Sequence, residues 1–161
     1  MEFTITRVFT LILYQPEIPP NTGNIIRLCA NTGTKLHLVR PLGFELDEPR
    51  LKRAGLDYRE FAEVETHDSL DDCLSRIAPR KLYALSTRGV TEHAAPEFQA
   101  GDAFLFGPET RGLPADILGS LPAEQRLRIP MREDSRSLNL SNAAAIVIYE
   151  AWRQLDFEAG R

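Results

Sequence analysis

The sequence predicts an α/β fold, a mostly parallel sheet with helices on both faces. Short apolar segments typical of strands alternate with segments whose apolar residues recur at helical spacing. This alternation favours parallel strands joined by helical crossovers, which cover both faces of the sheet. The chain has 161 residues, of which 43% are hydrophobic, enough for one domain with its own core. We therefore expect residues 1–161 to form a single domain.

Apolar or alternating runs mark the expected strands. These are Val8 to Tyr14, Lys35 to Arg40, Phe61 to Val64, Lys81 to Ser86, Ala103 to Phe106 and Arg126 to Ile129. Each run has the length of a strand and is flanked by residues typical of turns.

Helix patterns fill most of the gaps between these strands. Asn21 or Thr22 is expected to cap the first helix, which ends near Gly33, and Ser69 is expected to cap the next. Pro114 suits the first turn of a short helix over Leu113 to Leu118. The last helix is expected from about Asn139 to Leu155.

Composition excludes several classes of protein. The apolar runs are far shorter than a membrane span, and the start MEFTITRVFT lacks a secretory signal, so we expect a cytoplasmic protein that does not bind membranes. The net charge of −4 argues against broad, non-specific binding of nucleic acid. It does not exclude a local basic site, because four arginines lie at positions 126 to 136. A solvated basic rim explains the same residues equally well.

Cysteine and histidine spacing does not indicate a metal site. Cys29 and Cys73 fall on apolar positions of expected helices, so we interpret them as small core residues. His37, His67 and His93 lie far apart in the sequence and are expected to be surface or structural residues. The chain also lacks GxGxxG after a strand, GxxxxGK[ST] and GxSxG, which argues against dinucleotide, P-loop and hydrolase sites.

Polar loops are expected to meet at one edge of the sheet. Ligands of open parallel sheets bind beyond the carboxyl ends of the strands. PEIPPNTGN, FGPETRGLP and PMREDSRSLN each follow an expected strand, and STRG after Leu85 is a weaker candidate. The segment Ile129 to Glu150 runs from a strand end through a polar turn into an apolar helix, and this anchors many hydrogen-bonding groups to a rigid element.

Arg27 is the unusual residue of the first expected helix, because its neighbours are apolar. It is either a surface arginine or a binding residue that pairs with a phosphate or with a carboxylate such as Glu109. Position alone does not separate these two interpretations.

Together, NTGNIIR, FLFGPETRGLP and IPMREDSRSLNLSNAAAIVIYE resemble the three ordered motifs of the SPOUT methyltransferases, in the branch of 2′-O-ribose methylases. The resemblance covers about Leu11 to Leu155. It implies a deep trefoil knot in the C-terminal segment, which is a rare topology. It also implies a homodimer formed through the knot region.

The resemblance further implies S-adenosylmethionine as cofactor and assigns site residues. The cofactor pocket would be lined by Leu85, Ser86, Gly107, Ile129, Met131, Ser137 and Leu138. Arg27 would stabilise charge on the ribose oxygen, Glu109 would fix Arg27 or its loop, and Asn139 would hold the ribose or phosphate. Asn21 and Arg136 would contact RNA, and no metal is expected.

The expected reaction is 2′-O-methylation of the wobble nucleotide, a cytidine or uridine derivative at position 34, in leucine tRNAs. One alternative is 2′-O-methylation of another tRNA position or of ribosomal RNA. Another is an RNA-binding or assembly protein without catalysis, against which the presence of Arg27, Glu109, Ser137 and Asn139 argues.

Overall fold

The computed structural model describes residues 8–61 and 63–161. Its strands are β1 Thr10–Tyr14, β2 Lys35–Val39, β3 Glu65–His67, β4 Leu82–Leu85, β5 Thr91–Glu92, β6 Ala103–Phe106 and β7 Arg126–Arg128. Its helices are α1 Pro19–Thr32, α2 Glu48–Arg53, α3 Tyr58–Phe61, α4 Leu70–Ile77, α5 Ala115–Gly119 and α6 Leu140–Gln154, with a 3-10 turn η1 at Ala123–Gln125. The opening MEFTITR, in which we expect no secretory signal, lies outside the described residues.

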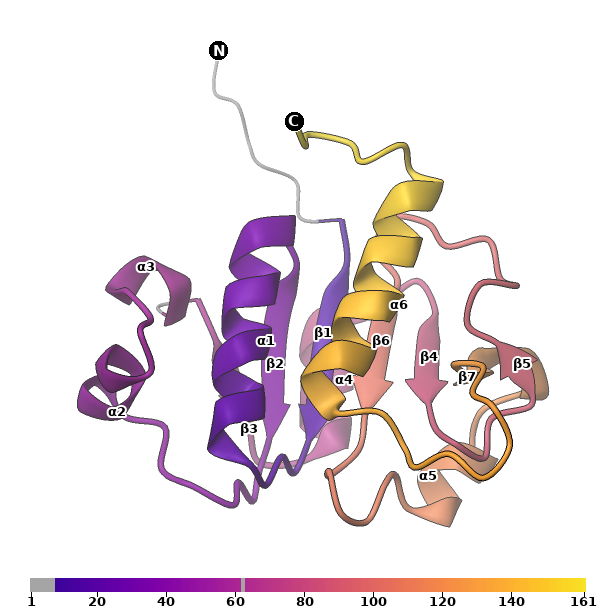
Figure 1. Ribbon diagram of the computed structural model, residues 1–161, viewed down its shortest axis with the longest axis horizontal. Helices are drawn as coiled ribbons and strands as arrows, with labels where there is room; N and C mark the ends of the chain where they lie inside the picture. The colour runs from indigo at the N-terminus through magenta and orange to yellow at the C-terminus, as the bar shows by residue number, and fades with distance from the viewer. Residues whose placement is uncertain (1–7, 62) are drawn as a thin grey trace.

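The seven strands form one sheet in the order β3-β2-β1-β6-β4-β7-β5 (Figure 1). Every strand pairing is parallel. The predicted α/β class with a parallel sheet is therefore confirmed. Because all strands point the same way, their carboxyl ends lie at one edge.

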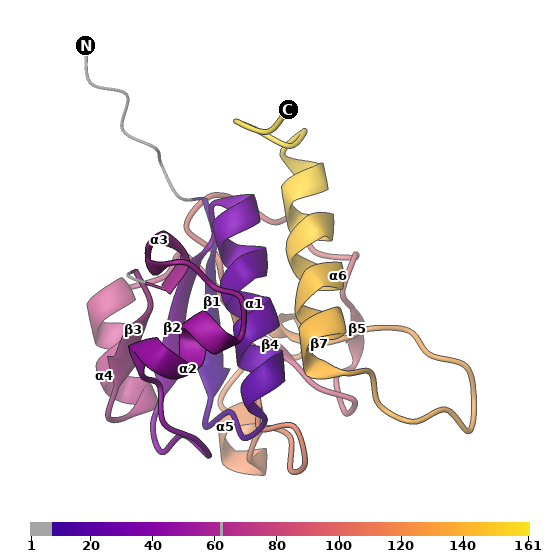
Figure 2. The same cartoon turned by 60° about the vertical axis from the view of Figure 1, so that its left-hand side comes forward.

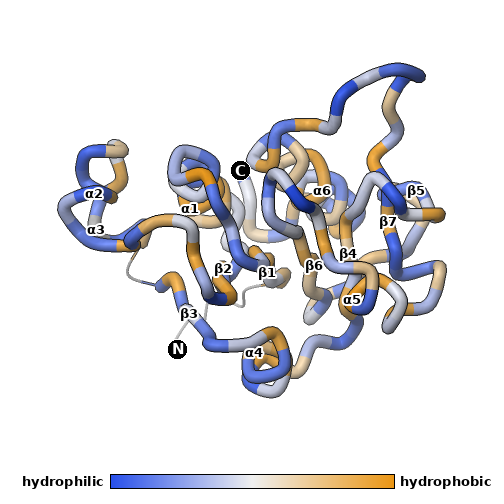
Figure 3. Tube along the Cα trace, turned by 90° about the horizontal axis from the view of Figure 1, so that it is seen from below, coloured by the Kyte–Doolittle hydropathy of each residue, from blue (hydrophilic) through white to orange (hydrophobic). Residues whose placement is uncertain are grey.

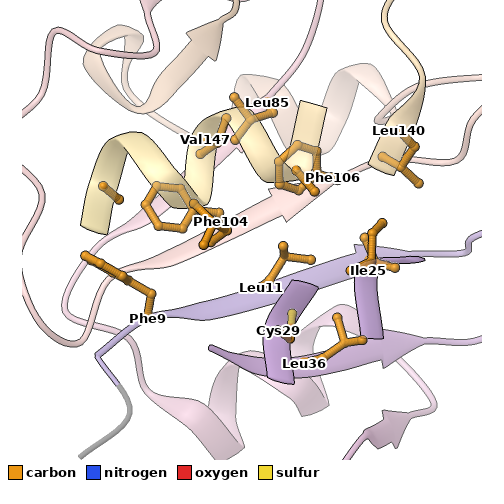
Figure 4. Packing of buried hydrophobic residues seen from close by; sticks show 14 of the residues in the cluster. Phe9, Leu11, Ile25, Cys29, Leu36, Leu85, Phe104, Phe106, Leu140 and Val147 are labelled. Carbon is orange, nitrogen blue, oxygen red and sulfur yellow. The ribbon is translucent and has the colours of Figure 1, made fainter. Parts of the chain in front are cut away.

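Helices cover both faces of this sheet. Seen from below, α1 and α6 lie on one side of the strands while α4 and α5 lie on the other (Figure 3). Leu11, Leu85 and Phe104 pack with Ile25 and Val147 beneath α1 and α6 (Figure 4). The opposite layer contains a second cluster, formed by Ile12, Val39, Cys73, Ala84, Ala103, Leu105, Leu113 and Leu118.

Both cysteines are buried and neither forms a disulfide, which confirms their interpretation as core residues. Cys29 lies in the layer under α1 and Cys73 in the layer under α4. The two thiols are therefore on opposite faces of the sheet.

Two local predictions are wrong. The strand expected at Phe61 to Val64 is instead β3, and Phe61 ends the short helix α3. Helix α1 begins at Pro19, before the caps expected at Asn21 or Thr22, because two prolines suit a first helical turn. Three short elements, α2, α3 and β5, were not predicted from the sequence, because they are only 6, 4 and 2 residues long.

The chain passes very close to itself beside two strand ends. A Cβ atom at Gly89 would lie 2.3 Å from the carbonyl oxygen of Leu127, and one at Gly107 would lie 2.4 Å from the backbone nitrogen of Leu113. Only glycine fits at these two positions. The trefoil knot implied by the resemblance stays a prediction. Among the described residues, no helix is both long and apolar enough to cross a membrane.

Asp102, just before β6, provides a test of the buried hydrogen bonds in this fold. Its fully buried carboxylate accepts bonds from Nε and Nη2 of Arg80 at 2.8 and 3.0 Å, and from the backbone N–H of Gln99 at 2.8 Å. We predict that Asp102→Ala lowers the free energy of unfolding by about 2 kcal/mol, because these donors lose their acceptor. Urea denaturation measures the change. Glu45→Ala, which breaks an exposed ion pair with Arg50, should change it by less than about 0.5 kcal/mol. Equal effects of the two substitutions would contradict the prediction.

Candidate functional site

A cavity of about 610 Å³ opens at the edge where β4, β6 and β7 end. This volume is within the range of pockets for small molecules and cofactors. Its walls come from the loops that follow these strands, from the start of α6, and from Ile18 and Asn21 beside the start of α1. Segments distant in the sequence are thus brought to one place by the parallel sheet.

All seven residues predicted to line a cofactor pocket lie in the wall of this cavity. They are Leu85, Ser86, Gly107, Ile129, Met131, Ser137 and Leu138. Glu109, Asn139 and Asn21 also line it. Several further wall residues were not predicted from the sequence, namely Ile18, Thr87, Arg88, Phe106, Pro108, Thr110, Arg111, Gly112, Leu140 and Ala143. Most of these belong to loops that the sequence did single out.

Glu109 holds the β6 loop to the start of α1. Its carboxylate accepts bonds from the backbone N–H groups of Glu17 and Ile18, at 2.8 and 2.7 Å, and from Nδ2 of Asn21 at 3.3 Å. Ile18 occupies the N-cap position of α1 and offers no side-chain cap of its own. Glu109 therefore supplies a negative charge and hydrogen-bond acceptors where a helix start requires them.

Glu17, just before α1, makes the reciprocal contact with the β6 loop. Its carboxylate accepts bonds from the backbone N–H of Thr110 at 2.9 Å and from the Thr110 hydroxyl at 2.8 Å. These hydrogen bonds, with a smaller contribution from the charge of Arg111, lower the pKa of Glu17 below its usual value. Two loops about ninety residues apart are thus held by reciprocal carboxylate contacts.

Asn139 connects the start of α6 to the same network. Its Oδ1 accepts bonds from the backbone N–H groups of Ser141 and Asn142, at 2.9 and 3.3 Å, and so caps α6. Its Nδ2 donates to Oδ1 of Asn21 at 2.9 Å. Asn21, from which we expect RNA contact, is buried and uses its amide on Asn139 and Glu109. Its position indicates that it organises the cavity wall.

Arg27 does not pair with Glu109, so that part of the prediction is wrong. Its Nε donates to Glu60 at 2.7 Å, and Nη2 bonds to the carbonyl of Gly55. The hydrogen bond and charge of Glu60 raise the pKa of Arg27. The Arg27 side chain is half exposed, and it lies outside the cavity wall of its own chain. Helix α1 turns this residue toward α3, because the opposite face of the helix is buried on the sheet.

The cationic groups nearest the cavity are Arg88 and Arg111, which line it. Nη2 of Arg88 donates to the carbonyl of Leu113 at 2.8 Å, and Arg111 reaches the side chain of Gln15 at 3.2 Å. Arg136, predicted to contact RNA, lies on the exposed loop between β7 and α6, which projects from the body of the molecule (Figure 2). It is outside the cavity wall but accessible to a large ligand.

The sequence pattern of the SpoU rRNA Methylase family matches residues 8–149. This chain belongs to that family. The matched residues include every strand and the whole cavity wall, so the resemblance to methylases of this type is confirmed.

Similar proteins carry more specific names than the SpoU methylase family. A relative in Aeromonas hydrophila subsp. hydrophila, named tRNA (cytidine(34)-2′-O)-methyltransferase, is 63% identical over 91% of this chain and 94% of its own. A solved structure described as "Structural insights into the 2-OH methylation of C/U34 on tRNA" is 46% identical, with a TM-score of 0.84 over 94% of this chain and 98% of that one. An AdoMet-bound rRNA methyltransferase from Sinorhizobium meliloti is 26% identical, with a TM-score of 0.76 over 92% and 57% of the two chains.

Removal of the Glu109 carboxylate tests the link between the β6 loop and α1 in this SpoU methylase. We predict that Glu109→Ala lowers the free energy of unfolding by about 1–2 kcal/mol, because the start of α1 loses its cap. Urea denaturation measures this loss. Glu124→Ala, in the 3-10 turn η1, removes an exposed carboxylate of equal charge and should leave stability nearly unchanged. A Glu109→Ala variant as stable as Glu124→Ala would refute a capping role.

Proposed function

We propose that this protein transfers a methyl group from S-adenosylmethionine to the ribose 2′-hydroxyl of the wobble nucleotide of leucine tRNAs. The acceptor is a cytidine or uridine derivative at position 34. The cavity that gathers all seven expected cofactor residues carries this proposal. The relatives named for methylation of cytidine 34 support the choice of nucleotide. A tRNA substrate places the expected site of action in the cytoplasm.

The cavity wall fits S-adenosylmethionine chemically. Leu85, Ile129, Met131 and Leu138 offer apolar surface for an adenine ring, while Ser86 and Ser137 offer hydroxyl groups for the polar parts. Gly107, which has no side chain, also lines the wall. When bound, the cofactor supplies a methyl group that is already activated by its sulfonium.

The protein's own task is then to orient a ribose hydroxyl, which is a weak nucleophile, and to stabilise charge on its oxygen. Asn139 is fixed at the start of α6 by its bonds to Ser141, Asn142 and Asn21, so its position at the cavity wall is rigid. We assign it to hold the ribose or phosphate. Glu109 holds the start of α1 against the β6 loop beside Asn139.

We assign charge stabilisation to Arg27, acting from a second copy of the chain. An arginine does not readily lose its proton, so it serves as a fixed cation and not as a base. In its own chain it lies outside the cavity wall, which leaves a partner's cavity as the place where it can act.

The exposed face of α6 is where a second copy of the chain could bind. Two large apolar side chains of this helix, Ile146 and Tyr149, are 38% and 43% exposed, as is typical of a protein interface. We therefore propose a homodimer whose interface includes α6. Analytical ultracentrifugation that showed an active monomer would overturn it.

The proposed reaction predicts a product that can be located. The protein, incubated with isotopically labelled S-adenosylmethionine and total RNA, should label leucine tRNAs at the 2′-oxygen of nucleotide 34 and no other RNA. Nuclease digestion and mass spectrometry locate the label. Ser137→Trp, which places a ring at the exposed edge of the cavity, is the inactive control. Label on ribosomal RNA or at another tRNA position would refute the assignment, and binding without label would favour a non-catalytic RNA-binding protein.

Arg27→Ala tests the proposed role from the partner chain. We predict unchanged affinity for S-adenosylmethionine in calorimetry and loss of methyl transfer, because Arg27 is assigned to the ribose oxygen of the acceptor and not to the cofactor. Arg27→Ala and Ser137→Trp chains, mixed after unfolding and refolding together, should recover about a quarter of wild-type activity, since half of random dimers hold one intact site. No recovery in the mixture would contradict action across the dimer, and full activity of Arg27→Ala would exclude the role altogether.

A further inference from the structure

Three metal-binding side chains that are distant in the sequence meet on the sheet face covered by α4. One ligand atom each from His37, His67 and Cys73 lies within 4.8 Å of the others, and all three residues are buried. The spacing of these residues in the sequence led us to expect no metal site. The fold brings His37 and His67 together, because β2 and β3 are neighbours, and both are buried residues of the structure.

The register of the parallel strands explains this meeting. His37 lies opposite Glu65, and Val39 lies opposite His67, in the β2 and β3 pairing. Residues two apart on a strand share a face, as do paired residues on adjacent strands. His37, Glu65 and His67 therefore lie on one face, and Cys73 belongs to the core cluster that packs there under α4.

The two histidines are close enough to share a ligand. Nδ1 of His37 and Nε2 of His67 are 2.8 Å apart, and the rings stack with centroids 5.0 Å apart. In tetrahedral zinc sites, neighbouring nitrogen and sulfur ligands are about 3.3–3.7 Å apart, as Zn–N and Zn–S bond lengths require. A displacement of about half an ångström would open the pair to a metal ion. The Glu65 carboxylate lies 3.7 Å from Nδ1 of His37 and pairs with Lys35 at 3.1 Å and with Arg76 at 3.3 Å, so it completes the set only by leaving these two cations.

One ring nitrogen of this cluster has no hydrogen-bond partner. Within the described part of the chain, Nε2 of the fully buried His37 has no hydrogen-bond partner. Buried polar atoms are otherwise almost always paired. Nδ1 of the same ring faces His67 and Glu65, so Nδ1 is the nitrogen that is available to a metal, and Nε2 keeps the ring proton.

We propose that His37, His67 and Cys73, with Glu65, form a structural zinc site that ties α4 to the β2 and β3 edge of the sheet. Two imidazoles, a thiolate and a carboxylate are ligands that Zn²⁺ accepts in tetrahedral geometry. The site lies on the sheet face opposite α1 and α6, and none of its residues lines the cofactor cavity. Its role is independent of methyl transfer.

Metal titration of the full chain tests this proposal. After treatment with a chelator, the protein should bind one Zn²⁺ per chain, and its melting temperature should rise with Zn²⁺ concentration. Co²⁺ in place of Zn²⁺ should produce a thiolate-to-metal charge-transfer absorption. That band should disappear in Cys73→Ala and persist in Cys29→Ala, which removes the thiol on the opposite face of the sheet.

The ligand variants separate this site from adventitious binding. His67→Gln and Cys73→Ala should each weaken Zn²⁺ affinity by more than about 100-fold, and Glu65→Gln by about 10–100-fold. His93→Gln should bind as wild type. Circular dichroism of each variant without metal checks that the fold persists. Absence of stoichiometric Zn²⁺, or equal binding by wild type, His67→Gln and Cys73→Ala, would overturn the proposal and leave a hydrogen-bonded histidine pair beside a buried thiol.

Discussion

Parallel pairing of β1 with β6, and of β6 with β4, is the constraint on which the rest of this structure depends. It places Tyr14, Leu85 and Phe106 at one edge of the sheet, although they are separated by long stretches of chain. The loops that follow must then share the same space. The cavity is a consequence of that convergence, and the carboxylates of Glu109 and Glu17 fix the loops once they meet. Burial of the central strands on both faces keeps this arrangement from shifting.

Much of this edge could be predicted from sequence because its signals are local. Apolar runs marked the central strands, Ser69 was a recognisable cap for α4, and the last helix was expected from about Asn139, the residue that caps α6. The polar loops after these strands contained most of the cavity wall. Residue types near a strand end are thus informative even when the partner strands are unknown.

What sequence could not predict depends on contacts between distant segments. The cap of α1 comes from Glu109, so no capping residue at the start of the helix marked its first turn. The partner of Arg27 is Glu60 on the short helix α3, which is too brief to leave a helical pattern. The meeting of His37 with His67 required knowledge that β3 pairs with β2 and in which register. In each case the deciding contact joins segments that are distant in the sequence, and it outweighs the local pattern on which the prediction was based.

The order of strands also affects how the protein behaves toward other copies of itself. The two edges of the sheet are β3 and β5, with 3 and 2 residues, so few backbone N–H and C=O groups are left unpaired there. Long exposed edge strands can pair with another sheet and nucleate aggregates. Here the hydrophobic strands β1, β6 and β4 are all interior, where both of their edges are occupied. The topology therefore limits contacts between molecules to the surfaces of helices and loops, and hydrogen-bonded extension of the sheet into fibres is disfavoured.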